Sequence, residues 1–146
     1  LAVQGREGVT AEEEVALFIA DRREHLEKLI LPSLREGKIV ILDRYYYSTM
    51  AYQGAAGLDP DDIERRHRDF APEPDLLVIL DLPVEEALRR ITHKRGDTPD
   101  AFEGREYLEK VDAVFRRVRH PHMVRLDARQ SPEDLVQSLC REVFIS

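Results

Sequence analysis

The chain has 146 residues, of which 42% are hydrophobic and 35% charged, and its formal net charge is −7. That length suits one domain with a core of its own, so we expect residues 1–146 to form a single soluble domain. The negative charge argues against DNA or another nucleic acid as the main partner. No apolar run approaches the roughly 18 residues of a membrane span, and no signal peptide opens the sequence. The sole cysteine, Cys140, lies in a helical apolar pattern, which predicts a small core residue in a reducing compartment.

A long helix is predicted near the N-terminus. Thr10 followed by Glu13 forms the capping-box pattern, so the helix begins near Ala11. We expect Pro32 to bend this helix or to sharpen its last turn, and Gly37 to end it. Its apolar residues recur with a helical period that faces a core: Val15, Phe18, Ile19, Leu26, Leu29, Ile30 and Leu34.

Arg22 is unusual because it falls on this apolar stripe, one turn after Phe18. An unpaired charge that is buried costs free energy, so the arginine needs a partner. One interpretation is a side chain that reaches solvent along its aliphatic stem, or an internal ion pair, for example with Asp43. The other interpretation is a ligand-binding arginine beside an aromatic ring.

The next segment carries the strongest chemical signal. The unbroken apolar run Ile39–Leu42 predicts a strand buried on both faces of a parallel sheet. It ends in Asp43 and Arg44, and ligands of open α/β sheets bind outside the carboxyl ends of the strands. Arginine binds phosphate through a bidentate fork, and an aspartate suits Mg²⁺ or its waters; a surface salt bridge is the plainer alternative. The residues beyond them offer a wall of hydroxyl and amide groups suited to a heterocycle and a sugar: Tyr45, Tyr46, Tyr47, Ser48, Thr49, Tyr52 and Gln53.

The rest of the chain alternates helices with strands, which predicts an α/β fold of parallel βαβ units with right-handed crossovers. Asp59 and Pro60 begin a helix that runs to about Ala71. His67 in that helix has no metal-ligand partner at helical spacing, so we assign it no chemistry. Strands are predicted over Leu76–Leu80 and Met123–Asp127, and helices over Val84 to about His93, over Tyr107–Val118 and from Ser131 onward, with Leu135, Leu139 and Val143 buried.

The segment Asp43–Gly54 reads Asp-Arg-Tyr-x-x-Ser-x-x-Ala-Tyr-Gln-Gly, which resembles the nucleotide-binding segment of thymidylate kinases, the P-loop enzymes that phosphorylate dTMP. The resemblance runs from about Ala11 to the C-terminus and implies a P-loop NTPase-like parallel sheet with flanking helices, as in nucleoside-monophosphate kinases. Further similar segments follow in the family's order: Leu17–Arg22, Pro74–Leu76, Leu80–Leu82, Phe102–Glu103 and Leu126–Ala128.

The resemblance implies phosphoryl transfer from ATP to dTMP, giving dTDP, with Mg²⁺ as cofactor. Phe18 would stack on thymine, and Arg22 would donate a hydrogen bond to its O4. Arg44 would hold the 5′-phosphate as a catalytic and substrate-binding residue, and Asp43 would orient Mg²⁺ or its waters. Tyr52 would pack where a ribose 2′-hydroxyl projects. The resemblance also assigns Ser48, Thr49 (at the base edge) and Gln53 to the substrate, and Arg90 and Asp127 to the ATP side.

A polar and basic loop from Thr92 to Asp100 matches the position of the family's lid, which closes over the ATP phosphates and supplies cations. The family often has Asp-Arg-Phe-Glu at this place, whereas this chain has Ala101 where the arginine would be. We therefore expect Lys94 and Arg95 to stand in as catalytic cations. An ordinary exposed loop is the alternative.

No segment matches the Walker-A pattern G-x-x-x-x-G-K-[ST], which cradles the phosphates of ATP. We therefore expect the family's N-terminal βαβ portion to be missing here, either because the sequence is a fragment of a longer kinase or because the protein is a remnant without catalysis. The intact acceptor residues favour a fragment, which would bind dTMP without measurable turnover.

Two alternatives to a dTMP kinase stay open: a non-catalytic nucleotide-binding or assembly module, and a kinase of another nucleoside monophosphate. Phe18, Arg22 and Tyr52 favour thymidylate. The resemblance further implies a cytoplasmic homodimer.

Overall fold

The computed structural model describes residues 8–95 and 101–144, with side chains for residues 8–92 and 104–142. The chain divides into two compact units, Leu1–Glu73 with Glu106–Arg117 and Pro74–Arg105 with Val118–Ser146. The prediction of a single domain over 1–146 stays a prediction.

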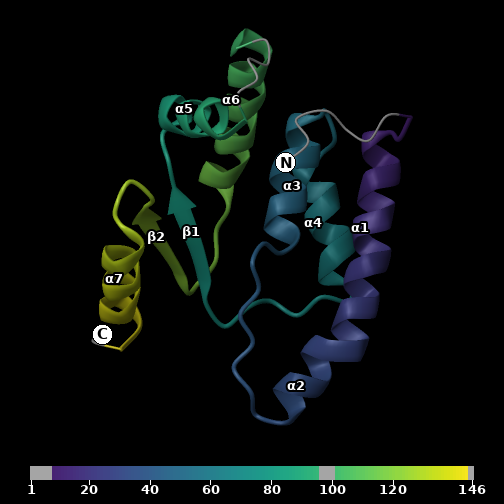
Figure 1. The fold of residues 1–146 in the computed structure, drawn as a ribbon. Coiled ribbons are helices and arrows are strands. Elements are labelled where there is room, and N and C mark those ends of the chain that lie inside the picture. The colour runs from purple at the N-terminus through teal and green to yellow at the C-terminus, as the bar shows by residue number, and fades with distance from the viewer. Residues whose placement is uncertain (1–7, 96–100, 145–146) are drawn as a thin grey trace. The chain divides into compact units, whose positions relative to one another are not determined.

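The first unit is helical. It contains α1 (Ala11–His25), the π-helical turn η1 (Leu26–Ile30), α2 (Leu31–Arg35), α3 (Tyr46–Ala55), α4 (Pro60–Arg68) and most of α6 (Ala101–Arg117). Helices α1, α3 and α4 pack side by side (Figure 1). The largest fully buried side chains of this unit are Val15, Leu26, Tyr46, Ile63 and His67.

The predicted start and end of the first helix are confirmed. Thr10 Oγ1 accepts a hydrogen bond from the Glu13 amide at 3.2 Å, and the Glu13 carboxylate accepts one from the Thr10 amide at 2.7 Å. Proline has no amide hydrogen, and its ring crowds the preceding turn. The helix widens just before Pro32, where the Leu31 amide donates to the Leu26 carbonyl across a π-helical turn. Gly37 then ends the helical stretch with φ +75°.

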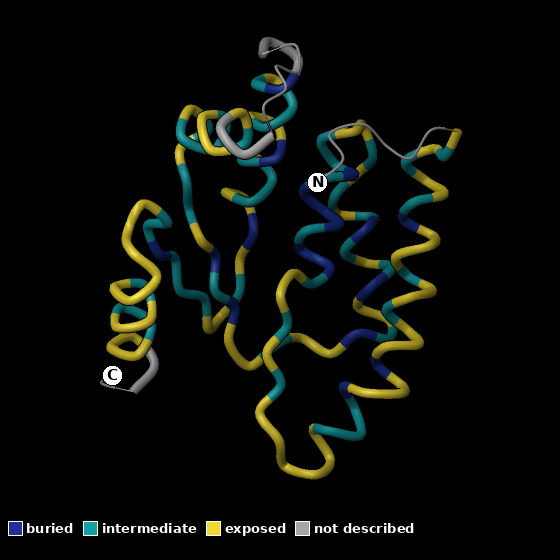
Figure 2. Tube along the Cα trace, viewed as in Figure 1, coloured by how far each residue is buried: buried dark blue, intermediate teal, exposed yellow. Residues whose placement is uncertain are grey.

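The predicted buried strand at Ile39–Leu42 is wrong. These residues have no regular secondary structure, and Ile39 and Ile41 are 92% and 89% exposed. Figure 2 shows that most of the segment between α2 and α3 is exposed. A strand is buried only if neighbouring strands and helices cover it, and in the described residues the sheet consists of two other strands. The apolar run therefore lies uncovered here.

The second unit is built on two parallel strands, β1 (Leu77–Asp81) and β2 (Met123–Asp127). Their register pairs Leu77 with Met123 and Asp81 with Asp127, so both aspartates end their strands at the same edge. This pairing confirms the parallel α/β character and both predicted strands, the first shifted by one residue. The unit also contains α5 (Val84–Arg95) and α7 (Pro132–Phe144). The predicted loop at Thr92 begins later, because α5 continues to Arg95.

Cys140 is exposed, so the prediction of a core cysteine is wrong. Helix α7 packs on β2, and the half-buried Leu135 and Leu139 share one side of the helix. Each residue of an α-helix is rotated by about 100° from the one before it. Cys140 therefore lies on the side that turns away from Leu139. The Val143 side chain lies outside the described residues.

Candidate functional site

Arg44 has an unusual backbone conformation. Its φ is +66°, in the left-handed region, where a side chain with a Cβ is uncommon. Its guanidinium Nη2 donates to the Tyr52 hydroxyl at 2.9 Å, and its Cζ lies 4.8 Å from the Tyr52 ring centroid. Strained residues of this kind gather at ligand sites, where the surrounding structure holds them in place. The predicted phosphate-binding arginine therefore sits on a specialised turn between the exposed segment and α3.

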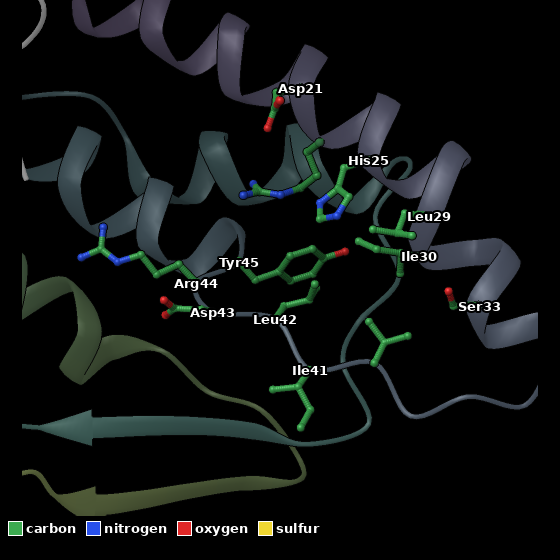
Figure 3. A pocket seen from close by; sticks show the side chains of 12 residues that line it. Asp21, His25, Leu29, Ile30, Ser33, Ile41, Leu42, Asp43, Arg44 and Tyr45 are labelled. Carbon is green, nitrogen blue, oxygen red and sulfur yellow. The ribbon is translucent and has the colours of Figure 1, made fainter. Parts of the chain in front are cut away.

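Tyr45 follows on that turn and faces the other way. Figure 3 shows that Arg44 and Tyr45 extend in opposite directions and that the Tyr45 ring lies between α1 and Leu42. The Tyr45 hydroxyl donates to the Pro72 carbonyl at 3.1 Å. Burial raises the pKa of Tyr45, so this phenol stays protonated and acts as a donor. From the sequence, Tyr45 was predicted only as one of several residues that offer hydroxyl or amide groups to a ligand.

Arg22 is half-buried, and its partners are aromatic. Its Nη1 lies 3.1 Å from His67 Nε2, and its Cζ lies 5.0 Å from the Tyr45 ring centroid. Burial lowers the pKa of Arg22, although the residue remains charged because arginine titrates far above neutrality. The suggested ion pair with Asp43 is replaced by this histidine contact. Phe18, one turn earlier on α1, is 44% exposed, so its ring offers a surface to a ligand.

A hollow of about 410 Å³ brings three of the predicted residues together (Figure 3). Arg22 enters it from α1, and Asp43 and Arg44 enter from the turn before α3. Its volume falls within the range of about 300–1,000 Å³ that small-molecule sites occupy. The other residues that line it are Asp21, His25, Leu29, Ile30, Ser33, Val40, Ile41, Leu42 and Tyr45.

The remaining predicted substrate residues lie outside the lining of this hollow, Phe18 on α1 and the others on α3. Ser48 and Tyr52 are half-buried, whereas Thr49 and Gln53 are only 5% and 7% exposed. Gln53 Nε2 donates to the Glu14 carboxylate at 3.1 Å and so connects α3 to α1, while its buried Oε1 has no hydrogen-bond partner among the described residues. The Tyr52 carbonyl accepts from the Tyr107 hydroxyl at 3.0 Å. These contacts fix the helix that carries Tyr52.

Tyr46 and Tyr47 belong to the core rather than to an exposed wall. They are 0% and 4% exposed, and the Tyr46 hydroxyl donates to the Tyr47 hydroxyl at 3.0 Å. Burial raises the pKa of both phenols. Of the tyrosines in this segment, only Tyr45 and, seven residues later, Tyr52 therefore keep hydroxyl groups that are accessible to a ligand.

In the second unit, charged side chains gather where β1 and β2 end. Arg125 donates to Asp81 at 2.8 Å, and Arg129 pairs with Asp127 at 2.6 Å. The hydrogen bonds from Arg129 lower the pKa of Asp127 to about 2, so this carboxylate is ionised at neutral pH. Arg90 donates to the Ala128 carbonyl at 3.1 Å, which brings it beside the predicted Asp127. The two residues assigned to the ATP side thus lie at one end of this sheet.

The side chains of the predicted lid cations, Lys94 and Arg95, lie outside the described residues. The backbone of both residues belongs to the last turn of α5. Residues 96–100 and the side chains of residues 101–103, which complete the predicted lid, also lie outside the described residues.

The described residues contain no group of three or more His, Cys, Asp or Glu side chains that could hold a metal ion. Mg²⁺ commonly binds through one or two carboxylates together with substrate phosphates and waters. The exposed carboxylate of Asp43, which lines the hollow beside Arg44, fits that manner of binding.

His67 is a residue of this site that sequence analysis missed. It is 0% exposed, its Nδ1 lies 2.7 Å from the Ile63 carbonyl, and its ring stacks on Tyr46 at 5.5 Å between centroids. A signal was present in the sequence, since His67 follows Ile63 by one helical turn and so shares its buried side.

None of the helices in the described part of the chain combines the length and apolar character that a membrane crossing requires.

A parallel sheet with charged residues at the carboxyl ends of its strands is the arrangement of an open α/β fold that binds ligands at that edge, the class to which P-loop NTPases belong. The chain belongs to the thymidylate kinase family, whose model matches residues 2–139.

Relatives named thymidylate kinase support this membership. The chain is 47% identical to the one from Desulfotalea psychrophila over 138 residues, 46% to the one from Brachyspira hyodysenteriae over 136, and 51% to the one from Akkermansia muciniphila over 134. These alignments cover 94%, 93% and 92% of this chain but 68%, 64% and 63% of the relatives. The chain thus spans about two thirds of their length.

Proposed function

We propose that the protein transfers a phosphoryl group from ATP to dTMP, giving dTDP. The observation that carries the proposal is the convergence of Arg22, Asp43 and Arg44 on one hollow, in a chain of the thymidylate kinase family. Arg22 comes from α1 and the other two from the turn before α3, so separate elements supply the base-reading and phosphate-binding groups.

Arg44 holds the 5′-phosphate of the acceptor. Its guanidinium is always charged and carries a planar set of donors that matches phosphate oxygens. In the structure its Nη2 donates a hydrogen bond to the Tyr52 hydroxyl, which orients the guanidinium. Ser48 and Gln53, on the same helix as Tyr52, are assigned to the nucleotide as well, and Thr49 to the base edge.

Phe18 and Arg22 recognise thymine. Phe18 presents an exposed ring one turn from Arg22, which suits stacking on a flat base. Arg22 donates to the O4 carbonyl, whereas cytosine carries an amino group at that place and offers no acceptor. Tyr52 lies where a ribose 2′-hydroxyl would project, so the site prefers a deoxyribonucleotide.

Asp43 supplies the carboxylate for Mg²⁺ or for its waters, and the ion, when bound, neutralises charge on the phosphoryl oxygens. Arg90 and Asp127 serve the ATP side, and Lys94 and Arg95 supply cations from the lid. Catalysis of phosphoryl transfer consists mostly of positioning and charge stabilisation, so these residues act by holding the two substrates rather than by covalent chemistry. The protein is proposed to work as a cytoplasmic homodimer.

Selectivity between dTMP and dCMP tests the thymine assignment. In the intact protein, Arg22→Ala should reduce the ratio of the two dissociation constants by roughly tenfold, because a hydrogen bond from a charged donor is lost for dTMP alone. Arg23→Ala is the matched control, since Arg23 is the exposed neighbour on α1 and its Cζ lies over the Phe70 ring at 3.9 Å. A ratio that is the same in wild type and Arg22→Ala would remove Arg22 from thymine recognition.

A further inference from the structure

Both ring nitrogens of His67 are engaged inside the first unit. Nδ1 lies 2.7 Å from the Ile63 carbonyl, and Nε2 lies 3.1 Å from Arg22 Nη1. A carbonyl only accepts hydrogen bonds, so Nδ1 carries the proton and donates. A guanidinium only donates, so Nε2 is the unprotonated acceptor. The two contacts together require the neutral imidazole with its proton on Nδ1.

The position of this acceptor is fixed by packing. The His67 ring stacks on Tyr46, with 21° between the ring planes, and lies 5.8 Å from the Phe70 ring. Tyr46 is itself held by its hydrogen bond to Tyr47. His67 is 0% exposed, so the ring has no room to change its rotamer. Nε2 therefore presents a lone pair at one defined place beside α1.

Arg22 is oriented by that lone pair. One guanidinium nitrogen binds His67, and the Tyr45 ring packs 5.0 Å from Cζ. Because the guanidinium is planar and rigid, fixing one N–H and one neighbour sets the direction of its other donors. The side chain that carries those donors, Arg22, lines the hollow together with Asp43 and Arg44.

We infer that His67 is a positioning residue for nucleobase selection: it accepts a hydrogen bond from Arg22 and so fixes the plane in which Arg22 donates to the O4 carbonyl of the base. The inference rests on the proposed function, because it assigns a support to the arginine that reads thymine there. His67 touches no substrate in this scheme. It acts through Arg22, and its effect appears in selectivity between bases.

The hydrogen bond that Arg22 donates to His67 depends on pH, because it requires the neutral imidazole. A protonated His67 would lose the acceptor at Nε2 and place a second cation against Arg22. Burial lowers the pKa of His67, which keeps the neutral form at ordinary pH. The charged and titratable groups that face it or its stacking partners are Arg22 and Arg23 on α1, Tyr46 and Tyr47 on α3, Arg66 and Glu64 on α4, and Glu73.

The test uses two substitutions in the intact protein. His67→Phe keeps a flat ring that can stack on Tyr46 and removes both nitrogens. His67→Gln places an amide oxygen near the position of Nε2 and so keeps an acceptor for Arg22. Ile63→Val is the control, because it trims a buried side chain next to His67 without touching Arg22. The measured quantity is the ratio of the dissociation constants of dCMP and dTMP, determined by calorimetric titration beside a thermal unfolding curve for each variant.

We expect His67→Phe to reduce this ratio by roughly tenfold, as for one lost charge-assisted hydrogen bond. His67→Gln should keep the ratio within about threefold of wild type, and Ile63→Val should leave it unchanged. In an Arg22→Ala background, His67→Phe should have no further effect, because the support then has nothing to position. A His67→Phe effect that persists in that background would overturn the inference.

Two further outcomes separate the inference from the function on which it rests. If Arg22→Ala lowers the ratio and the two His67 variants do not, the inference fails and the proposed function stands. If Arg22→Ala itself leaves the ratio unchanged, thymine reading by Arg22 fails and the inference fails with it.

Should His67→Phe not fold, a pH series decides. The wild-type ratio should fall as the pH is lowered below 6.5, because the pKa of buried His67 lies below that value, while the ratio of His67→Gln stays level. Both nucleotides carry the same phosphate, so its titration cancels in the ratio. A wild-type ratio as level as that of His67→Gln would overturn the inference.

Discussion

The backbone at Arg44 allows stability and binding to be tested separately. With φ +66°, Arg44 lies in the left-handed region, where an L-residue with a Cβ is destabilised by about 1–2 kcal/mol. Glycine avoids that cost, but it loses roughly 0.5–1 kcal/mol more in backbone entropy on folding. The difference predicts that Arg44→Gly is more stable than Arg44→Ala by about 0.5–1 kcal/mol.

Both variants lose the same side-chain contacts. The hydrogen bond to the Tyr52 hydroxyl at 2.9 Å and the stacking over its ring at 4.8 Å disappear in each, so these contacts cancel in the comparison. Both variants also lose the proposed phosphate contact. Loss of one charge-assisted contact that is shielded from water costs about 2–5 kcal/mol of binding free energy. The affinity for dTMP should therefore fall by roughly 30-fold or more in both.

Urea unfolding and calorimetric titration with dTMP measure the two effects on the same samples. Arg35 is the control, because the difference in stability between its glycine and alanine variants should have the opposite sign. It lies in the last turn of α2, where Arg35→Gly should be less stable than Arg35→Ala by about 1 kcal/mol. An Arg44→Ala protein more stable than Arg44→Gly would refute the left-handed turn. A dTMP affinity within twofold of wild type in both variants would refute the phosphate assignment.

Three other predictions concern neighbouring residues. Tyr52→Ala should narrow the preference for dTMP over ribothymidylate in competition titrations, whereas Tyr52→Phe should keep it; an unchanged preference in Tyr52→Ala would place sugar discrimination elsewhere. Gly54→Ala should lower the free energy of unfolding by about 1–3 kcal/mol in urea, because an added Cβ would lie 2.8 Å from Pro60 Cγ; a neutral substitution would contradict that packing. Because burial lowers the pKa of His67 from 6.5, the folded state disfavours its protonation, so the contribution of the neutral imidazole to stability is complete above about pH 6.5 and is lost as pH falls below it. The melting temperature of wild type relative to His67→Gln should therefore be constant above about pH 6.5 and fall below it, and a difference that stays constant below pH 6.5 would contradict the buried neutral state.

Much of the fold was predictable where the signal is local. The capping box at Thr10 and Glu13, the Asp59 cap of α4 and the apolar run of β1 depend on residues close in sequence, and the structure contains each of them. The interruption before Pro32 and the stop at Gly37 have the same origin, because proline and glycine constrain their own backbone.

The predictions failed where the outcome depends on distant neighbours. Ile39–Leu42 has the composition of a buried strand, yet burial requires partners that the run itself does not encode, and Ile39 is 92% exposed. Cys140 fits a helical apolar pattern but lies on the side of α7 that β2 does not cover. In both cases the pattern measures hydrophobicity, whereas burial depends on what packs against it.

The candidate site shows the same division. The residue types at Arg22, Asp43 and Arg44 pointed to a nucleotide, and the structure brings the three to one hollow. The contacts and backbone conformation that hold these residues were not predictable. The contact between Arg22 and His67 joins residues 45 positions apart, and nothing in an arginine side chain indicates the positive φ of Arg44. Sequence identified the chemistry of the groups, and tertiary contacts determine how they are held.

Phosphoryl transfer to dTMP is the central claim, and product formation measures it directly. A protein that carries a Walker-A segment together with these 146 residues is mixed with ATP, Mg²⁺ and dTMP, and dTDP is quantified by chromatography, with dCMP offered as a competing acceptor. The 146-residue chain alone serves as the control and should bind dTMP without measurable turnover. The account predicts turnover on the order of 1–100 s⁻¹ with dTMP, as for other kinases, strong preference over dCMP, and loss of activity in Arg44→Ala. Absence of dTDP above the protein-free reaction, or equal rates with dTMP and dCMP, would contradict it.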